Sequence, residues 1–479
     1  MDWHALILLP LGTALTLAAA GHALLHKSDP HSAWGWIAVC WLLPFGGPLL
    51  YFLFGINRIN THARKRGFPG AGPATAKPDS GADARHQREA SALAIPHGLN
   101  ELARTADALT RRPLLAGNHI TALHNGEQAY PRMLAAIDAA QHSIAFVTYI
   151  FETNRSGQQF AEALARAQAR GVELRCLIDG IGELHNWPHA GRMLRRRGVP
   201  FKRFNPPRLL PPSVHINLRN HRKLLICDGR IAYTGGMNIG DTYLGNDIHN
   251  SRRATDMHFE LRGPVIGQLA RAFADDWRYA SGQEWAPPAP PPPVATDGAA
   301  CRVITDGPNE DLGNLTMVLM AALSCAHHRI QIMSPYFLPP REMIVELQGA
   351  ARRGVDVSVI LPALSDGKIV HWATRNLLGQ LLQHGVKIYY QPPPFCHTKL
   401  FLIDNHYAQI GSANMDTRSL RLNFELAVEV YDSAFAHQLS QHFESIRAGA
   451  RQVTSEEIGQ RRLLPRIRDA LCWLFSPYL

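Results

Sequence analysis

The stretch RNHRKLLICDGRIAYTGGMN, residues 219–238, has a counterpart in FCHTKLFLIDNHYAQIGSAN, residues 395–414. The two stretches share His, Lys and Asp at fixed spacing, followed by Gly and Asn at equal distances from the His. In chain order these residues are His221, Lys223, Asp228, Gly235 and Asn238, and then His397, Lys399, Asp404, Gly411 and Asn414. So many matched positions make coincidence a poor explanation, and the sequence therefore predicts a duplicated unit.

The segments before each stretch repeat as well. In both, an amphipathic helix leads into an apolar strand, a second helix, a Gly-Val pair and a second strand. In the first unit we expect a helix over 133–140, a strand over 143–151, a helix ending at 169 and a strand over 173–179. In the second unit we expect a helix over 317–326, a strand over 330–338, a helix ending at 352 and a strand over 356–362. Helices that alternate with short β-branched apolar runs predict an α/β fold with a mixed or parallel sheet.

Each motif is expected on a strand, over 218–228 and 395–404, where side chains two positions apart lie on the same face. Phosphoryl transfer from a diester requires a nucleophile, an acid for the departing oxygen and positive charge on the other phosphate oxygens. Two sets of His, Lys and Asn provide all three without a metal or another cofactor. The catalytic candidates are His221, Lys223, Asp228, His397, Lys399 and Asp404. The candidates for phosphate binding and support are Asn238, Asn414, Ser412, Gly235 and Gly411.

An isolated His-x-Lys pair has a simpler explanation, namely a hydrogen-bonded core histidine beside an exposed lysine. Two copies with the same downstream Gly and Asn argue against it. A nucleophilic imidazole also needs an acceptor for its second N–H. Asp256 and Glu425 are the candidates for that acceptor, although a carboxylate on a strand is also compatible with a surface position.

The composition restricts the partners. The chain of 479 residues carries 49 Lys and Arg against 39 Asp and Glu, a net charge of +10, which favours acidic partners such as nucleic acid, anionic lipid or phosphate substrates. Its cysteines are scattered singly, without a C-x-x-C pair, which predicts reduced thiols and argues against a disulfide framework or a zinc site. Basic stretches interleaved with aromatic residues, typical of nucleic-acid binding, do not occur.

Two charge-free apolar stretches, residues 5–25 and 33–54, precede the repeated units. Each is long enough to cross a hydrocarbon core of about 30 Å, which predicts a transmembrane hairpin within residues 1–66. A cleaved signal peptide is the alternative for the first stretch, but a basic segment does not precede it. Basic residues follow the second stretch at Arg58, Arg64, Lys65 and Arg66, so the rest of the chain is expected in the cytoplasm.

The composition also predicts the remaining boundaries. Residues 67–109 are expected to form a flexible linker and residues 286–298 a stiff proline-rich spacer. The two α/β halves then cover residues 110–285 and 299–450. Residues 451–479 mix Arg with Leu, Ile and Phe, which predicts an amphipathic helix on an anionic membrane surface, with packing against the α/β body as the alternative.

The paired motifs, with GGMN at 235–238 and GSAN at 411–414, resemble the phospholipase D superfamily. More narrowly, the chain is similar to bacterial cardiolipin synthases over nearly its whole length apart from the linker. The segments that carry this likeness are AWGWIAVCWLLPFGGPLLYFLFG at 33–55, YIFETNRSG at 149–157, SPYFLPP at 334–340 and GSANMDTRSLRLNFE at 411–425. Gly236 departs from the second copy, where Ser412 supplies a hydroxyl.

The resemblance implies two α/β/α halves with one active site between them, in an enzyme of the bacterial inner membrane. It implies phosphatidylglycerol as donor and acceptor, with anionic membrane lipids around it, no nucleic acid, no metal and no obligate protein partner. His221 would attack phosphorus and His397 would act as acid and base. A phospholipase D-type hydrolase or an enzyme that exchanges another head group remains the alternative, because the same phosphohistidine serves water and lipid alcohol alike.

Overall fold

The computed structural model describes residues 3–27, 30–55, 95, 98–207, 218–295, 297–308 and 311–479. The chain divides into two compact units, Met1–Gly67 and Phe68–Leu479. Most of the expected linker and the basic residues after the second apolar stretch lie outside the described residues.

The first unit is a small helical assembly. It contains α1 (Trp3–His26), α2 (Pro30–Leu42), α3 (Gly46–Leu50) and a π-helical turn (Tyr51–Gly55). Within the described part of the chain, one helix is long and apolar enough to cross a membrane, over Leu8–His26. The second apolar stretch, residues 33–54, is divided between α2, α3 and the π-helical turn. Helix α2 stops after Leu42 because Pro44, the Gly46-Gly47 pair and Pro48 disfavour uninterrupted helix.

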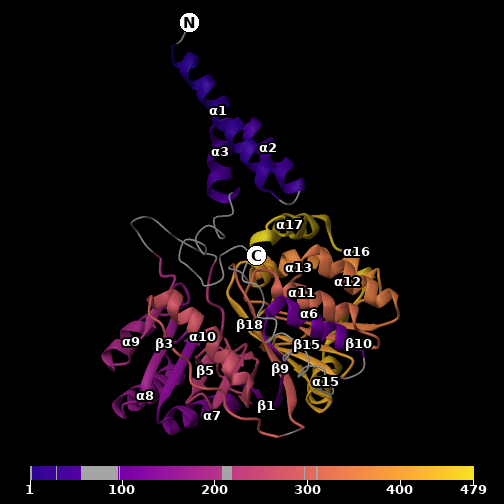
Figure 1. Cartoon of the computed structure of the whole chain (residues 1–479). Coiled ribbons are helices and arrows are strands. Elements are labelled where there is room, and N and C mark those ends of the chain that lie inside the picture. Colours follow the sequence, from indigo (N-terminus) through magenta and orange to yellow (C-terminus); the bar gives the residue numbers. More distant parts are fainter. Residues whose placement is uncertain are drawn as a thin grey trace. The chain divides into compact units, whose positions relative to one another are not determined.

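The second unit is built on one mixed sheet whose two halves follow the same plan (Figure 1). The first half contains β1 (Leu115–His124), α7 (Asn125–Ala139), β2 (Ser143–Thr148), α8 (Arg155–Ala169), β3 (Glu173–Asp179), α9 (Ala190–Arg196), β4 (Lys202–Phe204), β5 (Leu224–Cys227), β6 (Ile231–Gly235), β7 (Ala254–Thr255), β8 (Met257–Arg262) and α10 (Val265–Ser281). Short 3-10 turns lie at Gly182–His185 and Asp241–Tyr243.

The second half contains β9 (Ala299–Asp306), α11 (Asn314–Ser324), β10 (Arg329–Met333), β11 (Phe337–Leu338), α12 (Arg341–Arg352), β12 (Asp356–Pro362), α13 (Lys368–Leu382), β13 (Lys387–Gln391), β14 (Phe395–Cys396), β15 (Leu400–Ile403), β16 (Tyr407–Gly411), β17 (Met415–Asp416), α14 (Thr417–Arg421), β18 (Glu425–Tyr431) and α15 (Ser433–Ala448). The chain ends with β19 (Arg451–Val453), α16 (Ser455–Gly459), α17 (Leu463–Trp473) and a 3-10 turn at Ser476–Tyr478.

The strand order is β19-β13-β12-β10-β15-β16-β18-β9-β1-β8-β6-β5-β2-β3-β4. Outward from the central β9–β1 pair, both halves run through antiparallel strands to three parallel strands, β10-β12-β13 in one half and β2-β3-β4 in the other. In the second half, β19 adds an antiparallel edge strand beyond β13. The antiparallel pairing of β1 with β9, at Leu115↔Cys301 and Asn118↔Ala299, makes the two halves one sheet. This duplicated α/β arrangement confirms the expected fold class.

Three apolar cores hold the sheet. One packs α7, α8 and α9 against the first half, and a second packs α11, α12 and α13 against the other half. The third places α10 and α15 against strands of both halves. The two halves therefore share a core as well as a strand pair, which fixes their mutual position.

The expected strands over 173–179 and 356–362 coincide with β3 and β12. The motif strands are shorter than expected, because β5 begins after Lys223 and β15 after Lys399. The expectation of His and Lys within those strands is therefore wrong. Their backbone leaves the sheet to bond the other half instead, as the N–H of His221 does at 2.9 Å from the carbonyl of Phe424.

Two boundary expectations also need correction. The end of the expected linker forms α6 (Asn100–Thr110), whose Leu102, Ala103 and Ala106 are buried in the core of the second half. Small apolar residues at helical spacing made this possible, although the surrounding composition is that of a linker. The proline-rich segment does not separate the halves, since the N–H of Val294 donates to the carbonyl of Gly117 in β1 at 2.8 Å.

Candidate active site

Two crossing segments bring the motifs together. β14, which ends just before His397, pairs in parallel with β7 of the first half. In the symmetric position, Asn220 forms a bridge with Phe424 of the second half. The N–H of His397 donates to Thr255 at 2.7 Å, as that of His221 donates to Phe424. Each histidine is therefore tied to the residue that precedes a carboxylate of the opposite half.

These carboxylates contact the histidines in a crossed pattern. Nδ1 of His397 hydrogen-bonds Oδ2 of Asp256 at 2.7 Å, and Nδ1 of His221 hydrogen-bonds Oε2 of Glu425 at 3.2 Å, with Oε1 2.9 Å away. Both carboxylates are fully buried. A carboxylate can only accept, so each contact places the imidazole proton on Nδ1 and leaves Nε2 with a free lone pair.

The lysines lie beside their own histidines. Nζ of Lys223 donates to the carbonyl of His221 at 2.6 Å, and Nζ of Lys399 donates to that of His397 at 2.5 Å. Lys399 also lies 3.0 Å from Nδ1 of His397, but the shorter contact to Asp256 decides the position of that proton. An aromatic edge flanks each imidazole, with ring centroids 5.1 Å apart for Tyr149 and His221 and 5.7 Å apart for Tyr243 and His397.

Burial and mutual charge set the electrostatics of the site. Burial lowers the pKa of Lys223 to about 7 and that of Lys399 to about 8. Burial also raises the pKa of Asp256 to about 6. The pKa of His397 is well below its usual value because of burial and then the charges of Lys399, Lys223 and His221. Charges from both motifs thus contribute to the lowered pKa of His397.

The two halves support their carboxylates differently. In the second half, Oγ of Ser412 donates to Glu425 at 2.5 Å. In the first half, a side chain at Gly236 would overlap the carboxylate of Asp256. The N–H of Met257 donates to Oδ1 of Asp256 at 2.7 Å instead. The missing hydroxyl at Gly236 is thus compensated by the backbone.

Asn238 and Asn414 are not equivalent either. Nδ2 of Asn238 donates to the hydroxyl of Tyr243 at 2.8 Å, and its Oδ1 accepts the N–H of Ile150 at 3.1 Å. These contacts give Asn238 a supporting role. In the described part of the chain, Oδ1 of Asn414 is buried without a hydrogen-bond partner.

Asp228 and Asp404 contact backbone rather than the histidines. Asp228 accepts the N–H groups of residues 141–143 at 2.8–2.9 Å, where β2 begins. Asp404 accepts those of residues 327–329 at 2.7–2.8 Å, where β10 begins. Their assignment as catalytic residues is therefore revised, since their oxygens are occupied in joining neighbouring strands. Gly235 and Gly411, with φ of 150° and 153°, allow close approach of β8 and β18.

Sequence reasoning missed a buried polar network behind His221. Asp276 of α10 accepts from Nδ2 of Asn220 and from Arg222, both at 2.8 Å. Arg222 also donates to the carbonyl of Glu425 at 3.0 Å. The residues on both sides of His221 are thus held by one carboxylate. The unbroken run of polar residues from Arg219 to Lys223 was the only sequence signal for it.

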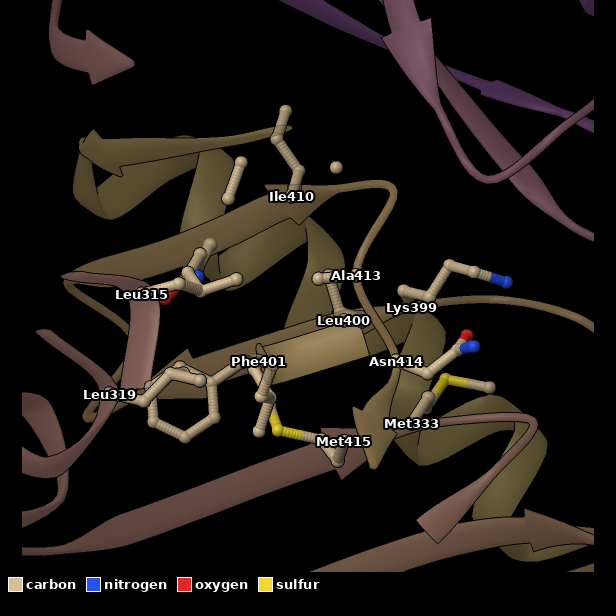
Figure 2. Close-up of a pocket in the computed structure, with 14 residues that line it drawn as sticks. Leu315, Leu319, Met333, Lys399, Leu400, Phe401, Ile410, Ala413, Asn414 and Met415 are labelled. Atoms are coloured by element: carbon tan, nitrogen blue, oxygen red, sulfur yellow. The ribbon is translucent and has the colours of Figure 1, made fainter. Parts of the chain in front are cut away.

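A small cavity of about 20 Å³ lies behind the second motif. Figure 2 shows the polar ends of Lys399 and Asn414 pointing the same way, on the side away from Leu315, Leu319 and Phe401. The cavity has space for about one water, so it is not a substrate pocket. Among the described residues, no group of His, Cys, Asp and Glu is arranged to hold a metal ion.

Comparison with known proteins places these features in a family. A family model described as "Cardiolipin synthase, PLD-like domain" matches residues 133–277 and 319–447, and one described as "Phospholipase_D-nuclease N-terminal" matches residues 14–55. Cardiolipin synthase A of Pseudomonas aeruginosa PAO1 is 33% identical over 468 residues, which cover 97% of this chain and 94% of the relative. Cardiolipin synthase of Geobacillus kaustophilus is 32% identical over 467 residues, 95% of this chain and 90% of the relative.

A solved structure shares the fold. Phosphatidylserine synthase of Haemophilus influenzae aligns with a TM-score of 0.62 at 14% identity and covers 79% of this chain and 100% of that one.

Proposed function

Because the chain belongs to the bacterial cardiolipin synthases of the phospholipase D superfamily, we propose that it converts two molecules of phosphatidylglycerol into cardiolipin and glycerol. The observation that carries this proposal is the crossed pair of histidine–carboxylate contacts, His221 with Glu425 and His397 with Asp256. The contacts leave two imidazole nitrogens free in one buried site. One nucleophile and one proton carrier are what a two-step phosphatidyl transfer requires.

In the first step, Nε2 of His221 attacks phosphorus of the donor. The bond from phosphorus to the glycerol oxygen breaks, and His397, which enters this step with Nε2 protonated as well as Nδ1, gives that oxygen the Nε2 proton. The resulting phosphatidyl-imidazole is cationic, and the buried charge of Glu425 stabilises it. The pKa of Glu425 is lowered despite its burial, because His221 and Lys223 lie beside it. Lys223 and Lys399 offset the charge on the other phosphate oxygens.

In the second step, the terminal hydroxyl of another phosphatidylglycerol loses its proton to His397 and attacks phosphorus. The phosphorus–nitrogen bond breaks, which releases cardiolipin and restores His221. Water in place of the lipid alcohol would give phosphatidic acid, the product of the hydrolase alternative.

We also propose that the N-terminal unit spans the membrane twice and leaves the α/β unit in the cytoplasm. Helix α1 and the family of the chain support membrane association. The two spans and their direction follow from the second apolar stretch and the basic residues after it. Accessibility of a tag at residue 479 in intact and permeabilised bacterial cells tests this orientation, and a tag exposed outside intact cells contradicts it.

The test of the reaction is product mass analysis with purified full-length protein and phosphatidylglycerol in detergent. We expect cardiolipin and glycerol in equal amounts, with and without a chelator. Phosphatidic acid as the sole lipid product would refute the synthase assignment. Replacement of either His221 or His397 by Ala should abolish turnover, and the trapped phosphohistidine should map to the peptide containing residue 221.

A further inference from the structure

A stripe of exposed apolar side chains runs along α17. Its members, which we call the α17 stripe, are Leu463, Leu464, Ile467 and Leu471 in the helix and Leu474 and Phe475 in the turn that follows it, each 46–79% exposed. At 3.6 residues per turn the four helical members fall within an arc of about 100°. A stripe of this width normally faces a core, yet here it faces outward.

The opposite side of α17 is fixed to α13. Asp469 is fully buried and accepts from Arg461 and Arg468, both at 2.6 Å. The guanidinium of Arg468 lies 4.3 Å from the ring centroid of Trp372 in α13. The polar side of α17 thus packs on the α/β unit, and the apolar side, which the packing alternative placed against that unit, is exposed.

The end of this segment reaches the active-site region. The N–H of Arg418 in α14 donates to the carbonyl of Leu479 at 3.0 Å. The carbonyl of Arg418 accepts the N–H of Asn423 at 3.0 Å, and the next residue, Phe424, accepts the N–H of His221. The chain end that follows α17 therefore contacts α14, the helix that follows the second motif.

Loops next to the site also expose large apolar residues. Leu184 and Trp187 are 52% and 80% exposed, and His185 between them contacts Tyr149 with ring centroids 5.9 Å apart. Leu364 is 66% exposed in the loop that holds Asp366, the hydrogen-bond partner of Tyr336. Each half thus exposes large apolar side chains in a loop that contacts a tyrosine through a polar residue, His185 in one half and Asp366 in the other.

We propose that the α17 stripe docks onto an anionic lipid bilayer and holds the active site at the level of the lipid head groups. Exposed Arg466, beside the stripe on α17, and exposed Arg462, just before the helix, would pair with lipid phosphates. A helix with Leu and Phe on one side and Arg beside them is the type that lies in a membrane interface. The choice of a bilayer over a protein rests on the proposed function, because a phosphatidyl transferase must reach lipid head groups.

The first test identifies what covers the stripe. A photo-crosslinking amino acid replaces Ile467 in the full-length protein, reconstituted in vesicles of phosphatidylcholine with phosphatidylglycerol. Its matched control replaces Met317, which is exposed on α11. We expect lipid adducts at position 467 and far fewer at position 317. Adducts with a second copy of the chain, with another segment of the same chain or with water would overturn the proposal.

The second test separates docking from chemistry. The stripe variant carries Leu464→Gln, Ile467→Gln and Leu471→Gln, and the control carries Met317→Gln and Val345→Gln, which are exposed on α11 and α12. On phosphatidylglycerol in vesicles, we expect the stripe variant to lose at least about tenfold in turnover, with turnover on short-chain monomeric substrate within about twofold of the unmodified protein. Equal turnover of both variants on vesicles would overturn the proposal. If the unmodified protein makes no cardiolipin, the proposed function fails, whereas the crosslinks still decide docking.

Discussion

At the scale of single residues, the site depends on three groups whose charges are lost near neutral pH. The pKa of Asp256 is raised to about 6, so its carboxylate is lost as pH falls through that value. The pKa values of Lys223 and Lys399 are lowered to about 7 and about 8, so their charges are lost as pH rises. We expect kcat/KM to fall on the acid side near pH 6 and on the alkaline side between pH 7 and 8.

Lys223→Arg tests the alkaline limb, since a guanidinium keeps its charge throughout this range. The absolute rate should fall because the shape of the side chain changes. The pH at which kcat/KM falls on the alkaline side should rise towards about 8, the pKa of Lys399. Lys387→Arg, at an exposed position of β13, serves as the control. If kcat/KM of Lys223→Arg falls at the same alkaline pH as that of the unmodified protein, the charge of Lys223 does not set the alkaline limit.

Gly236 and Ser412 occupy equivalent positions in the two motifs, and substitutions at both test how each carboxylate is held. Gly236→Ala would push the Asp256 carboxylate away from Nδ1 of His397, so we expect kcat/KM to fall at least about tenfold, with a smaller effect on KM. Ser412→Ala removes one hydrogen bond to Glu425 and should reduce the stabilisation of this carboxylate by about 1–3 kcal/mol. The carboxylate itself should keep its position. Steady-state kinetics of both variants would decide, and an unaffected Gly236→Ala would refute the close packing at Asp256.

At the scale of elements, Asp228 and Asp404 act as connectors between strands. Asp228→Ala leaves three N–H groups at the start of β2 without their acceptor, so we expect the free energy of unfolding to drop by about 1–3 kcal/mol. Asp228→Asn is the control, because Asn tolerates the φ of 52° and keeps one acceptor. Denaturant unfolding measures the loss. A pH profile with displaced limbs in Asp228→Ala would instead favour a direct part in the chemistry.

Local signals predicted the elements that local packing determines. β3 and β12 are largely buried apolar strands that each follow a Gly-Val pair, and their expected bounds are those observed. The motif strands were predicted too long because the backbone at His221 and His397 bonds the opposite half. α6 was missed because its partners in α11 lie some two hundred positions away. Such pairings between distant segments leave no periodicity in the sequence.

At the scale of the molecule, the sequence indicated two halves and one site but not how the halves share it. Asp256 and Glu425 were expected as acceptors without a partner assigned to each. Each histidine contacts the carboxylate of the other half because β14 pairs with β7 and Asn220 pairs with Phe424. Both pairings join the two halves. Each half therefore supplies a histidine to the carboxylate of the other, and neither half alone contains a complete histidine–carboxylate pair.

This crossing predicts how inactive variants combine. Because one chain contains both crossings, a protein with His221→Ala and another with His397→Ala should not restore activity when they are coproduced in one cell. Each variant coproduced with the unmodified protein, at the same total amount, provides the control and should retain the turnover of the unmodified fraction. Cardiolipin formation by the pair of variants, at a rate approaching half that of the unmodified protein, would show that halves of different copies form the site. That result would replace the crossing within one chain by an exchange between chains.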